Sequence, residues 1–212
     1  MKNKDTLEIV FIRHAQTCYE DIGDRDPSDG ELTAEGERQC ELLGEKLKDI
    51  HFDAYISSSL LRAFRTAAGV CRAKGDNPLI EICPELVECG CTPGYYGCSE
   101  EYLRKGYDNA KMCETKLYGT TEYDFVCATD EENDIRAQKV IDYLKSRFTF
   151  GDRVAVFSHH GILEHLIPTA LGVKPHVFRF ALDNVSVTVV EYHRDGTAIL
   201  RCVNREDMQY SL

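Results

Sequence analysis

Short apolar runs alternate along the chain with longer stretches in which apolar residues recur every three or four positions. The short runs, at residues 7–12, 54–57, 79–82 and 154–157, have the length of buried strands. The longer stretches have the spacing of amphipathic helices. Because strands that alternate with helices usually form a parallel sheet covered on both faces, we expect an α/β fold, a three-layer α/β/α sandwich with a mostly parallel sheet.

Capping residues mark where two of the helices should begin. Thr33 precedes a stretch with apolar residues at positions 40, 43, 47 and 50, and its side chain is expected to cap that helix. Ser58 or Ser59 is expected to cap the next helix, which has apolar residues at positions 61, 64, 68 and 71. Both helices should turn these positions toward the sheet.

Two further helices are predicted in the second half of the chain. Residues 131–148 should form a helix whose apolar side includes Ile135 and Ile141. A shorter helix should begin near His160 and bend or end near Pro168, because proline lacks an amide hydrogen and clashes with the preceding turn. The alternation of strands and helices stops there.

A hairpin and one irregular segment complete the predicted domain. Residues 185–192 and 198–203 read as two strands joined by a turn at Asp195-Gly196. This hairpin would supply an edge of the sheet, and two such edges could pair to give a homodimer. Residues 89–130 have no regular pattern and are rich in Gly, Tyr, Cys and charge. We therefore predict a single domain over residues 1–212, with residues 89–130 inserted as a cap over the site.

Charge and cysteine content restrict the partners. A net charge of −11 argues against nucleic acid or an anionic membrane as a partner, since both bind basic surfaces. The first apolar run, residues 7–12, is too short for a signal peptide or a membrane span, so we expect a cytoplasmic protein. Its ten cysteines should then be reduced thiols. The pair Cys89 and Cys91 has no second pair to complete a zinc pattern, so no metal site is predicted.

Arginine and histidine residues gather where three predicted strands end. Arg13 and His14 follow the first strand, and Arg62 lies in the first turn of the second helix. Ser158 and His159 follow a later strand. Because the carboxyl ends of parallel strands meet at one edge of a sheet, these side chains should share one site. A few converging Arg and His residues make one cleft positive even in an acidic protein, so a small anionic substrate suits this site.

The same segments resemble the histidine phosphatase (phosphoglycerate-mutase-like) superfamily, over about residues 7–203. The resemblance rests on an ordered set of motifs: Arg13-His14-x-x-Thr17, Leu32-Thr33-x-x-Gly36, Ser58-x-x-x-Arg62-Ala63-x-x-Thr66-Ala67, Leu86-x-Glu88 and Ser158-His159-x-Gly161. It implies a phosphatase in which His14 is the nucleophile. It also implies that Arg13, Arg62 and His159 hold the phosphoryl oxygens. Fixed positive charge then stabilises the developing anion, so neither a metal nor another cofactor is expected.

A proton donor and substrate contacts complete the predicted site. Glu88 falls where the family has its acid and is expected to protonate the leaving oxygen and later to activate water. Thr17 and Gln16 are expected to touch the phosphoryl group or the substrate. His160 competes with His159 for the third phosphate-binding position, and the family pattern favours His159.

Two other functions stay open on the sequence alone, and one other phosphatase chemistry is excluded. Mutases of this family usually continue the first motif with Trp-Asn, whereas this chain continues with Cys18-Tyr19 and has no tryptophan. A phosphate-binding protein without turnover would lack a nucleophile, an arginine or an acid, and all are present. Cys98 and Arg104 have the spacing of cysteine phosphatases, but the two glutamates between them would repel phosphate. We therefore expect a phosphomonoester hydrolase that forms a phosphohistidine and acts on a small phosphorylated metabolite.

Overall fold

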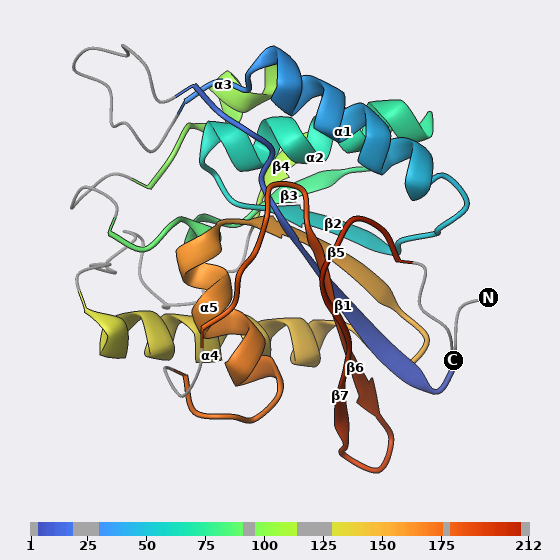
Figure 1. Ribbon diagram of the computed structural model, residues 1–212, viewed down its shortest axis with the longest axis vertical. Coiled ribbons are helices and arrows are strands. Elements are labelled where there is room, and N and C mark those ends of the chain that lie inside the picture. The colour runs from blue at the N-terminus through green and yellow to red at the C-terminus, as the bar shows by residue number, and fades with distance from the viewer. Residues whose placement is uncertain (1–3, 19–29, 91–95, 114–128, 176–178, 209–212) are drawn as a thin grey trace.

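One seven-stranded sheet runs through the protein in the order β4-β3-β2-β5-β1-β6-β7 (Figure 1). The computed structural model describes residues 4–18, 30–90, 96–113, 129–175 and 179–208. Its strands are β1 (Thr6–Arg13), β2 (Ala54–Ser57), β3 (Ile80–Ile82), β4 (Ala110–Met112), β5 (Arg153–Ser158), β6 (Val187–His193) and β7 (Ala198–Arg205). Its helices are α1 (Ala34–Lys46), α2 (Leu61–Lys74), the 3-10 turn η2 (Pro84–Leu86), α3 (Glu100–Arg104), α4 (Asp130–Arg147) and α5 (His160–Ala170).

Most of the sheet is parallel. The strands β4, β3, β2, β5 and β1 pair in parallel, whereas β6 pairs antiparallel with β1 and β7 antiparallel with β6. The turn of the β6–β7 hairpin contains Gly196 at φ 87°, a conformation that glycine adopts without steric cost. These pairings confirm the mostly parallel sheet and the terminal hairpin. The edge-to-edge homodimer stays a prediction.

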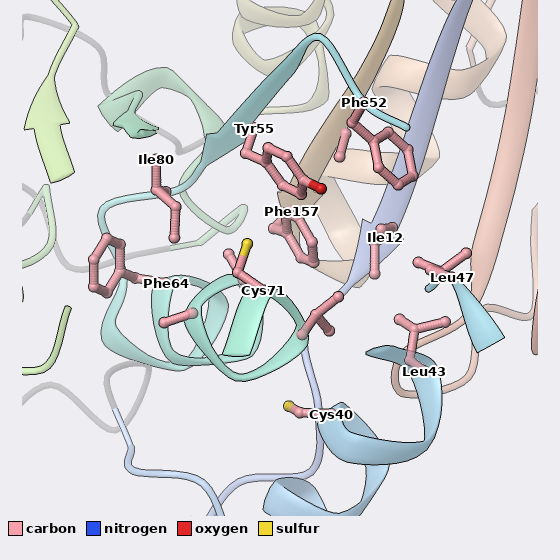
Figure 2. Packing of buried hydrophobic residues seen from close by; sticks show 14 of the residues in the cluster. Ile12, Cys40, Leu43, Leu47, Phe52, Tyr55, Phe64, Cys71, Ile80 and Phe157 are labelled. Carbon is pink, nitrogen blue, oxygen red and sulfur yellow. The ribbon is translucent and has the colours of Figure 1, made fainter. Parts of the chain in front are cut away.

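Two hydrophobic layers lie on opposite faces of the sheet. Val10 and Ile12 of β1 pack with α1 and α2, whereas Ile9 and Phe11 pack with α4 and α5. This alternation follows from the period of two in a strand, which sends neighbouring side chains to opposite faces. Figure 1 shows the two helix pairs on either side of the sheet, and Figure 2 shows the first layer, where Phe64 of α2 meets the strands. The three-layer sandwich is thereby confirmed.

The helix starts agree with the sequence in one case and differ in another. The Thr33 side chain accepts from the Gly36 amide at the start of α1, as predicted. The residue that caps α2 is Leu60, without a side-chain hydrogen bond, so the prediction of a serine cap was wrong. Both serines have other partners near the helix: Ser58 accepts from the Leu60 amide, and Ser59 donates to the Tyr96 carbonyl.

The buried side of α4 differs from the predicted one. Ile141 is buried, but Ile135 is 52% exposed, so its placement in the core was wrong. The nearby Asn133 and Arg136 are buried instead. Arg136 donates to the Val87 carbonyl, just after η2, and to the Asn133 side chain. Polar contacts therefore set the rotation of this end of the helix, which hydrophobic spacing cannot reveal.

The irregular segment contains more structure than the sequence indicates. Within residues 89–130, the structure has the helix α3 and the strand β4, and β4 extends the sheet by pairing with β3. The prediction of no regular element was therefore wrong for these residues. Residues 114–128 lie outside the described part of the chain, and so does any cap that they form. Within the described ranges, no helix has the length and apolar character needed to cross a bilayer.

Candidate active site

His14 lies in the loop that leaves β1 and is 2% exposed. Its Nδ1 atom is 2.8 Å from the carbonyl oxygen of Ala15. Because a carbonyl oxygen can only accept, Nδ1 must carry the proton, and Nε2 keeps its lone pair. A second contact fixes this loop against α2, since the Ala15 amide donates to the Thr66 hydroxyl at 2.9 Å. The loop therefore holds His14 in the tautomer that a nucleophilic imidazole needs.

His159 and Arg62 lie beside His14. The centroids of the two imidazole rings are 5.2 Å apart, and Nε2 of His159 is 2.9 Å from the Ser58 hydroxyl. Arg62, in the first turn of α2, is 2% exposed. The neighbouring His160 is directed elsewhere, with its Nε2 atom 3.1 Å from the Phe180 carbonyl oxygen. Of the two competing histidines, it is thus His159 whose ring contacts that of His14.

Burial and positive charge keep both imidazoles neutral. Burial is the main reason that the pKa of His14 falls from its ordinary 6.5 to about 3. The charges of Arg62 and Arg13 also lower this pKa, whereas the hydrogen bond to the Ala15 carbonyl raises it. Burial also lowers the pKa of His159 well below 6.5, and the charge of Arg62 is the next largest cause. Neutral imidazole is the nucleophilic form, so His14 is competent across the physiological pH range.

The lowered pKa values predict that acid weakens the fold. Below about pH 6.5 the unfolded chain binds protons on both histidines that the folded protein does not bind, so the free energy of unfolding should fall with decreasing pH. The slope for each histidine is at most about 1.4 kcal/mol per pH unit. Urea unfolding at pH 7, 6 and 5 in buffers without phosphate should show that the free energy of unfolding of His14→Gln depends less steeply on pH than that of the wild type. Equal pH dependence in the two proteins would contradict the prediction.

A cavity of about 500 Å³ opens beside His14. It is lined by Arg13, His14, Gln16, Thr17, Cys18, Thr33 and Asn184. Thr17 is 7% exposed, and its hydroxyl has no hydrogen-bond partner within the described residues. The side-chain oxygen of Gln16 accepts from the Thr33 hydroxyl at 2.7 Å. Arg62 and His159 do not line this cavity, because they are almost fully buried next to His14. The cavity thus gives a substrate access to Arg13, His14 and Thr17.

The turn after residue 182 holds the His14 loop from the other side, and sequence reasoning missed it. The Asn184 side-chain amide donates to the His14 carbonyl at 2.8 Å, and the Val185 amide donates to the Arg13 carbonyl at 3.1 Å. Val185 has φ 52°, which is rare for a β-branched residue and concentrates at functional sites. Asn184 is 170 residues from His14 in sequence, so no local signal indicates the contact.

The Glu88 side chain lies against the N-terminal end of α5, which begins at His160. Its carboxylate accepts from the amides of Cys89, Gly161 and Ile162 at 2.8, 3.2 and 3.0 Å. Amide groups at a helix start are otherwise unsatisfied, and they attract negative charge. The Glu88 carboxylate is therefore bound to the first turn of α5, the helix that begins directly after His159. A side chain at Gly161 would meet this carboxylate, since a Cβ atom there would be 2.6 Å from Oε1.

Substitution of Gly161 should displace Glu88. Gly161→Ala should lower kcat/KM for a phosphomonoester by about 10- to 100-fold, because small displacements of a catalytic group have effects of that size. Thermal unfolding should change little, since the helix gains from alanine while the carboxylate loses amide contacts. Steady-state kinetics should give Glu88→Ala a similar loss, and the double variant should lose no more than Glu88→Ala alone. Full activity in Gly161→Ala would contradict the argument.

Neither the cysteine-phosphatase alternative nor a metal site finds support in the described residues. The Nε atom of Arg104 donates to the Asp108 carbonyl at 3.1 Å, and residues Glu100–Arg104 form a helix rather than a phosphate-binding loop. In the ranges that the structure covers, no three His, Cys, Asp or Glu side chains are grouped to hold a metal ion.

Comparisons with known proteins show the family and support the fold. The family description of the histidine phosphatase superfamily (branch 1) matches residues 9–205. Phosphoserine phosphatase 1 of Hydrogenobacter thermophilus is 23% identical over 197 residues, which cover 92% of this chain and 91% of that protein. The α-ribazole phosphatase of Shigella flexneri has a TM-score of 0.65 at 22% identity, covering 97% of this chain and 100% of that one. A phosphoglycerate mutase of Bacillus anthracis has a TM-score of 0.62 at 20% identity, covering 97% and 96%.

Proposed function

Because the chain belongs to the histidine phosphatase superfamily (branch 1), we propose that it is a metal-independent phosphomonoester hydrolase that forms a phosphohistidine on His14. The observation that carries the proposal is the state of His14. Its Nδ1 atom donates to the Ala15 carbonyl, and burial together with Arg62 keeps the ring neutral. Nε2 therefore has a free lone pair in a site whose arginines attract a phosphoryl group.

The reaction has two steps that together return the protein to its starting state. In the first, Nε2 of His14 attacks phosphorus, the bond from phosphorus to the ester oxygen breaks, and the Glu88 carboxylate relays a proton from the phosphate group of the substrate to that oxygen. In the second, water attacks phosphorus, the Glu88 carboxylate takes a proton from the water and passes it to the phosphate product, and the bond from phosphorus to His14 breaks. A phosphomonoester has its second pKa near 6, so the substrate itself brings a proton into the site.

The other residues have roles in binding. Arg13, Arg62 and His159 hold the phosphoryl oxygens, and their positive charge or N–H groups stabilise the charge that develops on them. Thr17 contacts the phosphoryl group or the substrate, supported by its place in the cavity and its hydroxyl without a partner there. Gln16 lines the same cavity, but its contact with Thr33 makes it a rim residue whose main effect is on the shape of the entrance.

A cytoplasmic location belongs to the same proposal. Cys40 and Cys71 are free thiols buried in the core, and Cys83 and Cys202 are free thiols as well. Reduced thiols are typical of proteins that stay in the cytoplasm. Related proteins bear the names of phosphoserine, α-ribazole and glucosyl-phosphoglycerate phosphatases, so we propose a small phosphorylated metabolite as the substrate. Turnover against a panel of phosphorylated metabolites identifies it.

Turnover without metal ions, and a trapped intermediate, test the proposal. The protein should hydrolyse p-nitrophenyl phosphate in EDTA, and a quench into base during turnover should give a phosphopeptide that contains His14. Mass spectrometry should detect this peptide because phosphohistidine survives in base. Binding of phosphate without turnover would instead indicate a phosphate-binding protein. Turnover that depends on an added divalent cation, or a phosphoryl group trapped on a cysteine, would contradict the proposed mechanism.

A further inference from the structure

Arg136 has the largest side chain among the fully buried residues that the structure describes, and it is 1% exposed. It lies on α4, which packs against the sheet on the side of α5. A guanidinium group stays charged at any physiological pH, and burial of a charge is costly unless its hydrogen bonds are satisfied. The position of Arg136 in the interior therefore calls for a function that a hydrophobic residue would not perform.

The hydrogen bonds of Arg136 lie on both sides of Glu88. Nη1 donates to the carbonyl oxygens of Val87 at 2.7 Å and Glu85 at 3.3 Å, while Nη2 is 3.6 Å from the Cys89 sulfur. The residues directly before and after Glu88 thus contact one rigid planar group. The guanidinium is itself oriented by α4, because Nη2 also donates to the Asn133 side chain at 2.7 Å.

The Glu88 carboxylate is held by the backbone of α5. Its two oxygens accept from the amides of Gly161 and Ile162, in the first turn after His159. Arg136 therefore fixes the backbone on which Glu88 is carried, and α5 fixes the carboxylate. Arg136 also acts on the site through its charge, since it is among the groups that lower the pKa of His159.

We propose that Arg136 is a positioning residue that aligns Glu88 for proton transfer to the leaving oxygen. This inference rests on the proposed function, with Glu88 as its general acid. Arg136 acts through the backbone of residues 85–89 and does not touch the substrate. Lysine at this position would keep the charge but lose the planar group that joins several acceptors, so it should not replace arginine.

The dependence of the rate on the leaving group distinguishes this role from a structural one. A good leaving group such as p-nitrophenolate departs with little help from an acid, whereas an alkoxide needs a proton. A misaligned Glu88 should therefore slow alkyl phosphates much more than p-nitrophenyl phosphate. A general loss of structure should slow all substrates by the same factor.

The experiment measures kcat/KM in EDTA for substituted phenyl phosphates and glycerol phosphate, with the wild type, Arg136→Lys and Arg153→Lys. Arg153 is a matched control, because it is also buried and forms an ion pair with Glu8 at the opposite end of β5. We expect Arg136→Lys to lose about 10- to 100-fold more on glycerol phosphate than on p-nitrophenyl phosphate, within the range of general acid catalysis. Arg153→Lys should lose the same factor on both.

Two further variants keep the test decisive. If Arg136→Lys does not fold, Asn133→Ala, which releases Nη2 of Arg136, should show the same selective loss on a smaller scale. In the double variant Arg136→Lys/Glu88→Gln, the loss on glycerol phosphate should not exceed that of Glu88→Gln alone. An equal loss on all substrates would overturn the role of Arg136 and leave the phosphatase standing. A wild type that hydrolyses none of them would overturn the proposed function, and this inference with it.

Discussion

Replacement of His14 by alanine should lower kcat for p-nitrophenyl phosphate by about 10⁴-fold or more, because losses of this order follow removal of a nucleophile. The structure gives the physical reason. The side chain is neutral, its proton is held on Nδ1 by the Ala15 carbonyl, and its ring lies against that of His159. Among the described residues that line the cavity, His14 has the only imidazole. Stopped assays with the purified variant measure the effect, and the base-stable phosphopeptide should disappear with it.

A buried histidine elsewhere controls for the loss of packing. His165 on α5 is also 2% exposed, but its Nδ1 atom is 2.6 Å from a carboxylate oxygen of Asp134 on α4. His165→Gln should therefore lower the melting temperature while kcat stays within a few-fold of the wild type. If His14→Ala retained a tenth of the wild-type kcat, His14 would not be the nucleophile, whatever the result for His165.

The parts of the fold that the sequence predicts are those that local patterns determine. The strand β1 was predicted because its run of apolar residues is buried on both faces, and α1 because Thr33 precedes a clear helical repeat. The short strand β4 was missed because three residues carry no periodic pattern. It forms only through pairing with β3, 30 residues earlier in the chain. The same reason hides the exposure of Ile135, since polar contacts of its neighbours set the rotation of α4.

In the candidate site too, local patterns predict some residues, whereas contacts between distant segments determine others. His14, Arg62 and His159 follow strand ends, so the topology of a parallel sheet brings them together, and the sequence predicts this. The groups that orient them come from distant segments. Asn184 binds the carbonyl of His14 across 170 residues, and Arg136 contacts the residues beside Glu88 across about 50. Neither has a spacing that marks it, because a polar residue in the interior looks like a surface residue in the sequence.

Replacement of Arg62 by alanine should lower kcat/KM by about 10²- to 10³-fold, the usual effect of removing one group that stabilises a developing anion. Arg62 is 2% exposed, so its charge is screened little by solvent. Arg62→Lys should recover only part of the loss, because an ammonium group cannot bind two phosphoryl oxygens as a guanidinium does. Arg65→Ala is the matched control on the same helix, since its side chain is 30% exposed and pairs with Glu31.

The pH dependence of the same variant separates binding of the substrate from tuning of the nucleophile. The charge of Arg62 is the second largest cause, after burial, of the low pKa of His14. In the wild type, with that pKa at about 3, protonation of His14 leaves no acid limb in kcat/KM between pH 5 and 7. Without Arg62 the pKa of His14 should rise, so the acid limb of kcat/KM should begin at a higher pH than in the wild type. Arg62→Lys keeps the charge and should show no such displacement. A loss of rate with an unchanged pH profile in both variants would mean that Arg62 binds the phosphoryl group but does not keep His14 neutral.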